Sequence, residues 1–569
     1  MFHDIYGHEL DVLHKLAAEL AERCPELASI LGRDADPAMA RLLQRVAFAF
    51  ARVRQRIDDD VPEIIHAIFE DIDRAMLEPV PSTTLVELAA HPKTLRAATV
   101  IEAGATFTDS AAHPCVFSMT EPCEVRPWAL RDARVVGGER REIRLSLEVL
   151  GGAELPRAVG SDTIILALTG ALPSALDLRA WLLEHATAVR AVSGTTEIVL
   201  ARNVVAVPRV RDSSKQRHSL ALAPLRDYFA CARVFCRVAL PGAQQLASLG
   251  AEARRLDLVI ELDASLPPAI VIDTTTIALH TAPAVSLASV EARVEPAGPL
   301  RFVLRTDEPD HRIVDVMDVD LVDPGSLRAL TRWTPDAVLR DLGEAGGPIL
   351  FEVRRSPSVL EGEIDFELSL LDDDGPVPLP LNTHLRVRVL TTSAARAAGL
   401  AVGDIAHATE RSPVAMTFRN VTPVTRGGPP LFGGDRLWEL FHRIKLGLPA
   451  LTERESLGRL LSLLNGPARF GWPQAKPDAN AFAPLRGLTR RRGSTIADDE
   501  VCPGLELSLE LDTASFSSHG DVQLFGELVS ALLASALKPH EWVRLTLQLA
   551  NGERIIYPRL FGTRGGARP

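Results

Sequence analysis

Lysine and aromatic residues are scarce in this sequence of 569 residues, which contains six lysines and only 5% phenylalanine, tryptophan and tyrosine. Proteins that bind nucleic acid by base stacking need exposed aromatic side chains on a basic surface. This chain instead has a formal net charge of −12 and an isoelectric point near 5.7. We therefore expect no nucleic-acid partner.

Cysteines and long apolar runs are also few. Six cysteines without a Cys-x-x-Cys pair cannot staple a chain of this size, which favours a reducing compartment. The longest apolar run, LVSALLASAL at 528–537, is about half of the roughly 20 residues that a membrane-spanning helix needs. The N-terminus, MFHDIYGHEL, shows no signal peptide. We expect a cytoplasmic protein without direct membrane insertion.

Apolar residues make up 46% of the chain, enough for large cores, and the first eighty residues show helical spacing. Helices are predicted over about 8–22, 37–57 and 62–77. In the second, apolar residues alternate steps of four and three, a heptad-like seam. The seam consists of Met39, Leu43, Val46, Phe50, Val53 and Ile57, with Arg45 and Arg52 among the arginines beside it. It faces either another protein or the two neighbouring helices, and both alternatives are open.

From residue 81 onward the pattern changes to short strands in which apolar residues alternate, as at 143–149 and 505–511. Hairpins are predicted where 364–370 returns through Asp374-Gly375 to 385–389, and where 543–549 returns through Asn551-Gly552. Helices are predicted at about 174–188, 241–254, 434–465 and 521–537. The stretches 408–434 and 466–500 are rich in glycine and proline and are interpreted as loops or linkers.

These patterns predict an α+β multidomain fold, with a helical N-terminal region followed by β-rich domains with interspersed helices. The expected ranges are 1–80 for the helical region, 81–240 and 241–407 for two β-rich domains, 408–500 for linkers flanking a helical segment at 434–465, and 501–569 for a C-terminal α+β segment.

Two short stretches carry residues that could suggest chemistry. RGGPPLFGGDR at 426–436 precedes a helix, but it lacks Gly-Lys-Ser/Thr, and its two prolines remove amides that a phosphate cradle would use. HPCVFSMTEPC at 113–123 contains His113, Cys115, Glu121 and Cys123, at a spacing that matches no common zinc site. We interpret the first as a surface loop and the second as incidental composition.

The densest basic cluster consists of Arg486, Arg490, Arg491 and Arg492, with no interleaved aromatic residue. It is interpreted as a solvated or partner-facing loop. No His-Glu-x-x-His or Gly-x-Ser-x-Gly motif occurs. The sequence therefore predicts no enzyme, no cofactor and no metal site, and an enzyme using the 426–436 loop is a remote alternative.

Several segments together resemble the TssF (VasA/ImpG) family of type VI secretion baseplate subunits. The N-terminal motifs fall at 8–13, 36–52, 57–62 and Pro81-Ser82. Further similar segments are APLRDYFACARVFCRVAL at 223–240, LHTAPAVSLASVEARVEP at 279–296, and RNVTPVTRGGPP with LWELFHRIKLGLPAL within 419–451. The ending also resembles the family, with PGLELSLELDTASF, LFGELVSALLA and a late Tyr-Pro-Arg. None of these motifs is catalytic, and their order extends along nearly the whole chain.

The resemblance implies a structural role. It implies a wedge of two TssF copies with one TssG, connected to TssK, TssE and the VgrG spike, in a baseplate docked at the inner membrane complex. It also implies β-rich wing-like domains related to wedge proteins of contractile phage tails. The seam residues, with Trp438 and Phe441, are the expected partner contacts. The alternative is the wedge protein of a phage-tail-like contractile injection particle.

Overall fold

The computed structural model describes residues 74–562 except 112, 137–140, 208–221, 251, 309, 324, 333–348, 358–363, 373–374, 394–395, 415, 431–434, 470–481 and 498–499. Before residue 74 it describes 10, 13, 41, 44–49 and 68–69. The chain divides into two units, Met1–Asp71 and Ile72–Pro569. In the first unit, residues 44–49 are helical, with Ala47 buried and Phe48 exposed. Most of the three helices expected before residue 78 lies outside the described residues.

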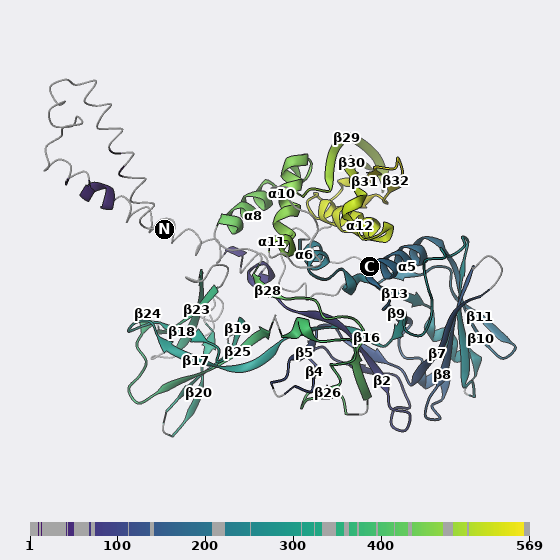
Figure 1. Cartoon of the computed structure of the whole chain (residues 1–569), viewed down its shortest axis with the longest axis horizontal. Helices are drawn as coiled ribbons and strands as arrows, with labels where there is room; N and C mark the ends of the chain where they lie inside the picture. The colour runs from purple at the N-terminus through teal and green to yellow at the C-terminus, as the bar shows by residue number, and fades with distance from the viewer. Residues whose placement is uncertain are drawn as a thin grey trace. The chain divides into compact units, whose positions relative to one another are not determined.

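The second unit contains a six-stranded antiparallel sheet made from chain segments far apart in sequence (Figure 1). Its strand order is β26 (His407–Ala408), β4 (Thr106–Thr108), β5 (Val116–Met119), β16 (Thr281–Ser286), β2 (Thr83–Ala90) and β27 (Met416–Asn420). Burial of apolar side chains, among them Phe107, Phe117 and Phe418, holds this sheet on its core.

Buried threonines reinforce the pairing of β2 with the segment after β27. The Thr84 hydroxyl lies 2.8 Å from the carbonyl oxygen of Thr422, to which it donates. The Thr422 hydroxyl oxygen accepts the backbone N–H of Leu85 at 2.9 Å. The buried hydroxyls of Thr84 and Thr422 thus both have hydrogen-bond partners, so their burial does not carry the free-energy cost of an unpaired polar group.

Between β5 and β16 the chain builds two further sheets. One has the order β11 (Thr196–Ala201), β10 (Ala186–Ser193), β14 (Arg255–Leu262), β8 (Glu142–Val149) and β7 (Trp128–Val136). The other has the order β12 (Val205–Ala206), β13 (Arg237–Pro241), β9 (Thr163–Leu168) and β15 (Ile277–Leu279). A small two-stranded sheet pairs β3 (Thr99–Ile101) with β6 (Cys123–Val125). Side chains of β8 alternate between buried and half-buried, which confirms the alternation predicted for 143–149.

Two predicted helices fall in this region. The helix expected at 174–188 is confirmed as α5 (Leu172–His185), which begins with Pro173 in its first turn. The helix expected at 241–254 is shorter and is a 3-10 helix, η6 (Ala243–Leu249). Helix η6 ends before Gly250, and β14 begins at Arg255. The prediction of a helix extending to residue 254 was therefore wrong.

Between β16 and β26 the chain forms a nine-stranded sheet. Its order is β20 (Leu327–Ala329), β19 (His311–Val322), β25 (His384–Ser393), β17 (Ala288–Pro296), β18 (Phe302–Arg305), β23 (Ile364–Asp372), β22 (Leu350–Pro357) and β21 (Thr331–Arg332), with β24 (Gly375–Val377) paired to β23. A core of aliphatic residues and phenylalanines, including Phe302, Phe351 and Phe366, lies on one side of it.

The hairpin expected between 364–370 and 385–389 was wrong in its return strand. Strand β23 pairs with the three-residue β24, whereas β25 pairs with β17 and β19. Pro376, Pro378 and Pro380 lie between β23 and β25 in the sequence. Because proline has no backbone N–H, this segment cannot continue the ladder, and the next strand joins another part of the sheet.

The C-terminal part combines helices with a five-stranded sheet. The helix expected at 434–465 is three helices, α8 (Asp435–Leu446), α9 (Leu448–Leu451) and α10 (Arg454–Leu464). The break lies at Gly447, whose φ of +60° and ψ of −139° favour glycine. The helix expected at 521–537 is confirmed as α12 (His519–Ser535).

The C-terminal sheet has the order β29 (Leu485–Ala497), β30 (Glu500–Leu511), β31 (Trp542–Leu549) and β32 (Arg554–Ile556), with β33 (Leu560–Phe561) paired to β31. The hairpin predicted at Asn551-Gly552 is confirmed by the pairing of Leu547 with Ile555. Two stretches expected as loops contain strands, since β27 and β28 (Gly428–Pro430) lie within 408–434 and β29 lies within 466–500. The expected domain ranges stay predictions.

Helix α12 joins this sheet to earlier parts of the second unit by packing against α5 and α6 (Leu222–Cys231). The Tyr228 hydroxyl donates to Asp521 Oδ1 at 2.5 Å. Asp521 Oδ2 also accepts from the backbone N–H of Ser517 at 2.8 Å. The rings of Tyr228, Phe482 and Phe516 lie within 6.0 Å of the ring of Phe525, which buries this junction.

A buried ionic cluster lies between the six-stranded sheet and the strands that follow it. Arg237 donates to Glu121 Oε2 at 2.6 Å, and Arg126 donates to the carbonyl oxygen of Thr163 at 2.8 Å. Arg126 also lies 2.6 Å from Glu124. Removing one partner of such a pair would leave an uncompensated buried charge, which is strongly destabilising.

His280 beside this cluster makes folding sensitive to pH. Burial, and the nearby positive charge of Arg126, lower the pKa of His280 to about 3. In the unfolded chain its pKa is about 6.5, so the unfolded state binds the proton first. This contribution to stability is complete above pH 6.5 and is lost as the pH falls toward 3, by about 1.4 kcal/mol for each pH unit.

We predict that His280→Asn removes this loss, because asparagine tolerates the left-handed backbone at this position, where φ is +49°. The free energy of unfolding should be measured by urea titration at pH 7 and pH 5. Between these values the wild type should lose about 2 kcal/mol more than the variant. An equal loss in both proteins would contradict a neutral buried His280.

Candidate partner-binding surfaces

Helix α8 presents an aromatic stripe on its outer side. Trp438 is 52% exposed, and Phe441 is half-buried, with its ring centroid 5.9 Å from that of Trp438. His442 and Lys445 continue the stripe at helical spacing and are exposed. Leu437 and Leu440 face the opposite way and are fully buried. The helix therefore has a buried aliphatic side and an accessible aromatic side.

Ion pairs fix α8 onto α10. Glu439 Oε1 accepts from Arg459 Nε at 3.1 Å and lies 3.6 Å from Arg443. Arg443 Nη1 also donates to the Ser456 hydroxyl at 2.6 Å. Because these contacts lie below the stripe, the position of Trp438 is set before a partner arrives. Tryptophan on a fixed support is the residue type that most often dominates protein–protein interfaces.

The arginine cluster expected in a loop lies on strand β29. Arg486 pairs with Asp512 at 2.6 Å, and Arg490 Nη1 donates to the Thr452 hydroxyl at 3.4 Å. Arg491 and Arg492 are exposed and have no ion-pair partner among the described residues. The strand thus concentrates positive charge on a chain that is acidic as a whole.

The same strand and β30 carry exposed apolar side chains that the sequence analysis missed. Ile496 is 75% exposed and Val501 is 72% exposed, and the two residues are paired across the strands. The alternation of LELSLEL predicted a strand, but the stretch 466–500, which contains Ile496, was interpreted as a loop or linker. The sequence signal that could have indicated these exposed residues was the position of Ile496 and Val501, one at each end of the acidic run Asp498–Glu500.

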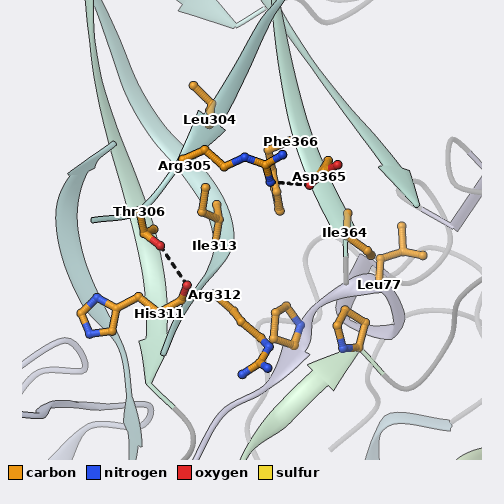
Figure 2. A pocket seen from close by; sticks show the side chains of 12 residues that line it. Leu77, Leu304, Arg305, Thr306, His311, Arg312, Ile313, Ile364, Asp365 and Phe366 are labelled. Carbon is orange, nitrogen blue, oxygen red and sulfur yellow. Dashed lines mark hydrogen bonds and ion pairs between the residues drawn. The ribbon is translucent and has the colours of Figure 1, made fainter. Parts of the chain in front are cut away.

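A cavity of about 150 Å³ lies beside the nine-stranded sheet (Figure 2). It is lined by Leu77 and Pro79, by residues of β18, β19 and β23, and by Pro430. Arg305 Nη1 donates to Asp365 Oδ1 at 2.6 Å at its wall. Sites for small organic ligands usually enclose about 300–1,000 Å³. This cavity is smaller than that range.

The seam residues expected to contact partners are only partly described. Val46 is half-buried and Arg45 is exposed, both on the helical stretch 44–49. Met39, Leu43, Phe50, Arg52, Val53 and Ile57 lie outside the described residues. Trp438 and Phe441 lie on α8 of the second unit, which is described separately. The assignment of these residues to a partner interface stays a prediction.

The residues between 113 and 123 are not brought together. The Cys115 sulfur accepts from Arg396 Nε at 3.3 Å, and Glu121 pairs with Arg237. Burial raises the pKa of the Cys123 thiol to about 12, which keeps it protonated at neutral pH. Across the residues described, no group of three or more histidine, cysteine or acidic side chains is arranged to hold a metal ion.

The glycine-rich stretch at 426–436 is packed against the start of the second unit. Strand β28 pairs with β1 (Pro79–Val80), and the Gly427 N–H donates to the Ser82 hydroxyl at 3.0 Å. The Gly427 amide is therefore already hydrogen-bonded and cannot contribute to a phosphate cradle. Residues 431–434 of this stretch lie outside the described residues. Within the described part of the chain, no helix is long and apolar enough to cross a membrane.

Comparison with solved structures shows the fold. A chain in a cryo-electron microscopy structure of the type VI secretion system TssK–TssF–TssG baseplate subcomplex matches this chain with a TM-score of 0.69 at 20% identity. The match covers 92% of this chain and 100% of that chain. A chain of the baseplate complex from the type VI secretion system matches with a TM-score of 0.50 at 16% identity, covering 99% of this chain and 100% of that one.

Sequence comparisons agree with the resemblance. The type VI secretion system component TssF1 of Pseudomonas aeruginosa is 29% identical over 209 residues, which is 33% of this chain. This match spans 34% of that relative, about a third of its length. The family model described as "Type VI secretion system, TssF" matches residues 1–564. The chain therefore belongs to the TssF family of type VI secretion system baseplate proteins.

Proposed function

We propose that this chain is a structural subunit of a baseplate wedge, assembling with TssG and TssK subunits. The observation that carries this proposal is the family match over residues 1–564. The fold match over 92% of the chain to a component of the TssK–TssF–TssG subcomplex supports it. Two copies join one TssG, and the wedge connects to TssE and the VgrG spike to support sheath assembly.

The proposed role needs binding surfaces and no turnover. The side chains that could suggest metal chemistry at 113–123 have separate structural partners. The glycine-rich stretch uses the Gly427 amide to hold Ser82. These groups thus hold parts of the framework together, which supports a non-enzymatic scaffold.

Two regions serve as contacts in this proposal. The first is the stripe on α8, where Trp438 and Phe441 lie on a helix fixed by ion pairs. The second is the heptad-like seam at 39–57, placed in a helical N-terminal segment that bundles with other wedge subunits. Arg45 and Arg52 form its rim. The same proposal includes three further points. The N-terminal segment is helical, the fold is related to wedge proteins of contractile phage tails, and the baseplate docks at the inner membrane complex.

Reconstitution tests the proposal directly. The full chain should be co-expressed with the TssG and TssK homologues of its own genome, and the purified product weighed by native mass spectrometry. We expect a stable complex that contains two copies of this chain for each TssG. A chain that stays monomeric in the presence of both homologues would contradict the proposal.

We predict that Trp438→Ala weakens assembly at least tenfold, because a central tryptophan commonly contributes 2 kcal/mol or more to an interface. The isolated variant should melt within a few degrees of the wild type, since Trp438 is 52% exposed. Phe561→Ala is the matched control, as Phe561 is a 41% exposed aromatic residue on β33. Equal affinities for the wild type and Trp438→Ala, measured by titration, would remove α8 from the interface.

A further inference from the structure

Strands β29 and β30 extend past the end of their sheet. Strand β31 begins at Trp542, which pairs with Gly504 of β30. Residues 494–497 and 500–503 therefore lie beyond the last residue pair with β31, and we call them the arm. A two-stranded ribbon alone is marginally stable in water, so other contacts must hold the arm.

One face of the arm is held by Trp542 at its base. Its indole Nε1–H donates to the carbonyl oxygen of Cys502 at 3.1 Å, and a Cβ on Gly504 would lie 2.1 Å from the indole ring. The Arg559 guanidinium lies 4.8 Å above the ring and donates to the Thr495 hydroxyl at 2.9 Å. The arm is thus fixed in direction.

The opposite face continues the buried face of the sheet. Because side chains alternate along a strand, Val501, Pro503, Leu505, Leu507 and Leu509 share one face of β30. Leu507 and Leu509 are buried, Leu505 is half-buried, and Pro503 and Val501 are exposed. Ile496 lies beside Val501 in register. In the described part of the chain, no residue covers this face at Ile496, Val501 and Pro503. The same face of β30 is buried further along the strand, at Leu507 and Leu509.

Charge on the arm limits what covers this face. Arg490 and Arg492 lie just below it on β29, on the same face of the ribbon as Ile496, and both are exposed. Arg492 pairs in register with Leu505 and has no ion-pair partner among the described residues, so its charge is not neutralised there. This end of the surface therefore attracts carboxylates.

We propose that this face of the arm docks an amphipathic helix of another protein that is acidic in its first turn. Its apolar stripe covers Ile496, Val501 and Leu505, and its first-turn carboxylates meet Arg490 and Arg492. Acidic first turns also suit the helix dipole. The inference rests on the proposed function, since it adds a partner surface to the same assembly.

A second copy of this chain fits the charges less well. Its seam helix is accompanied by five arginines between 41 and 56, which would lie against Arg490 and Arg492. That arrangement brings like charges together, whereas an acidic helix does not.

Photo-crosslinking of the reconstituted complex identifies the occupant. Ile496 is replaced by p-benzoylphenylalanine in the full chain, which is co-expressed with the TssG and TssK homologues of its genome. The expected product joins position 496 to an amphipathic helix of one homologue, with acidic residues at its start. Ile556, 65% exposed on β32 of the same sheet, is the control position and should give no such product. Crosslinking to a second copy, to a basic segment, or to nothing in an assembled complex would overturn the proposal.

Affinity measurements give a second readout. Ile496→Asp with Val501→Asp should weaken assembly at least tenfold, and Arg490→Glu with Arg492→Glu should do the same and reduce its salt dependence. The matched control, Ile556→Asp with Val199→Asp, alters two residues that are 65% and 55% exposed and should change affinity less than twofold. All variants should melt as the wild type does. If the wild type assembles and the arm variants assemble equally well, only this inference fails; if the wild type does not assemble, the proposed function fails as well.

Discussion

The pairing of β2 with both β16 and β27 is the constraint on which the second unit depends. It brings together residues that are far apart in sequence, as the Thr84–Thr422 hydrogen bond across 338 positions shows. Strand β16 leads into the nine-stranded sheet through β17, and β27 leads through β28 to α8. Loss of this pairing would release three chain segments at once, so the burial of Val86, Leu88 and Phe418 stabilises much more than one sheet.

A framework of this kind suits a scaffold because binding costs less when surfaces are already in place. The stripe on α8 is fixed by ion pairs of Glu439 and Arg443, and the arm is fixed by Trp542. In both regions polar or aromatic contacts lie on one side, while apolar side chains remain exposed on the other. Trp438, Ile496 and Val501 are therefore accessible without being loosely held.

Local patterns predicted many single elements, but not which elements pair. The strand at 143–149 and the helices α5 and α12 follow from residue spacing alone. The partner of β25 was missed because turn residues suggest a return strand, while the three prolines after Gly375 decide against it. The arm was missed because glycine and arginine suggested a loop, whereas Gly493 and Gly504 leave room for the ring of Trp542. Such long-range contacts are not encoded in local periodicity.

Hydrogen–deuterium exchange on the full chain, alone and assembled with its TssG and TssK homologues, tests the central claim that a preformed framework presents α8 and the arm to partners. Backbone amides of β2 and β16 should exchange slowly in both states, because they lie in the interior of their sheet. Amides of residues 435–446, 494–497 and 500–503 should exchange more slowly only after assembly. Slower exchange concentrated in β2 and β16, with none in α8 or the arm, would contradict the account.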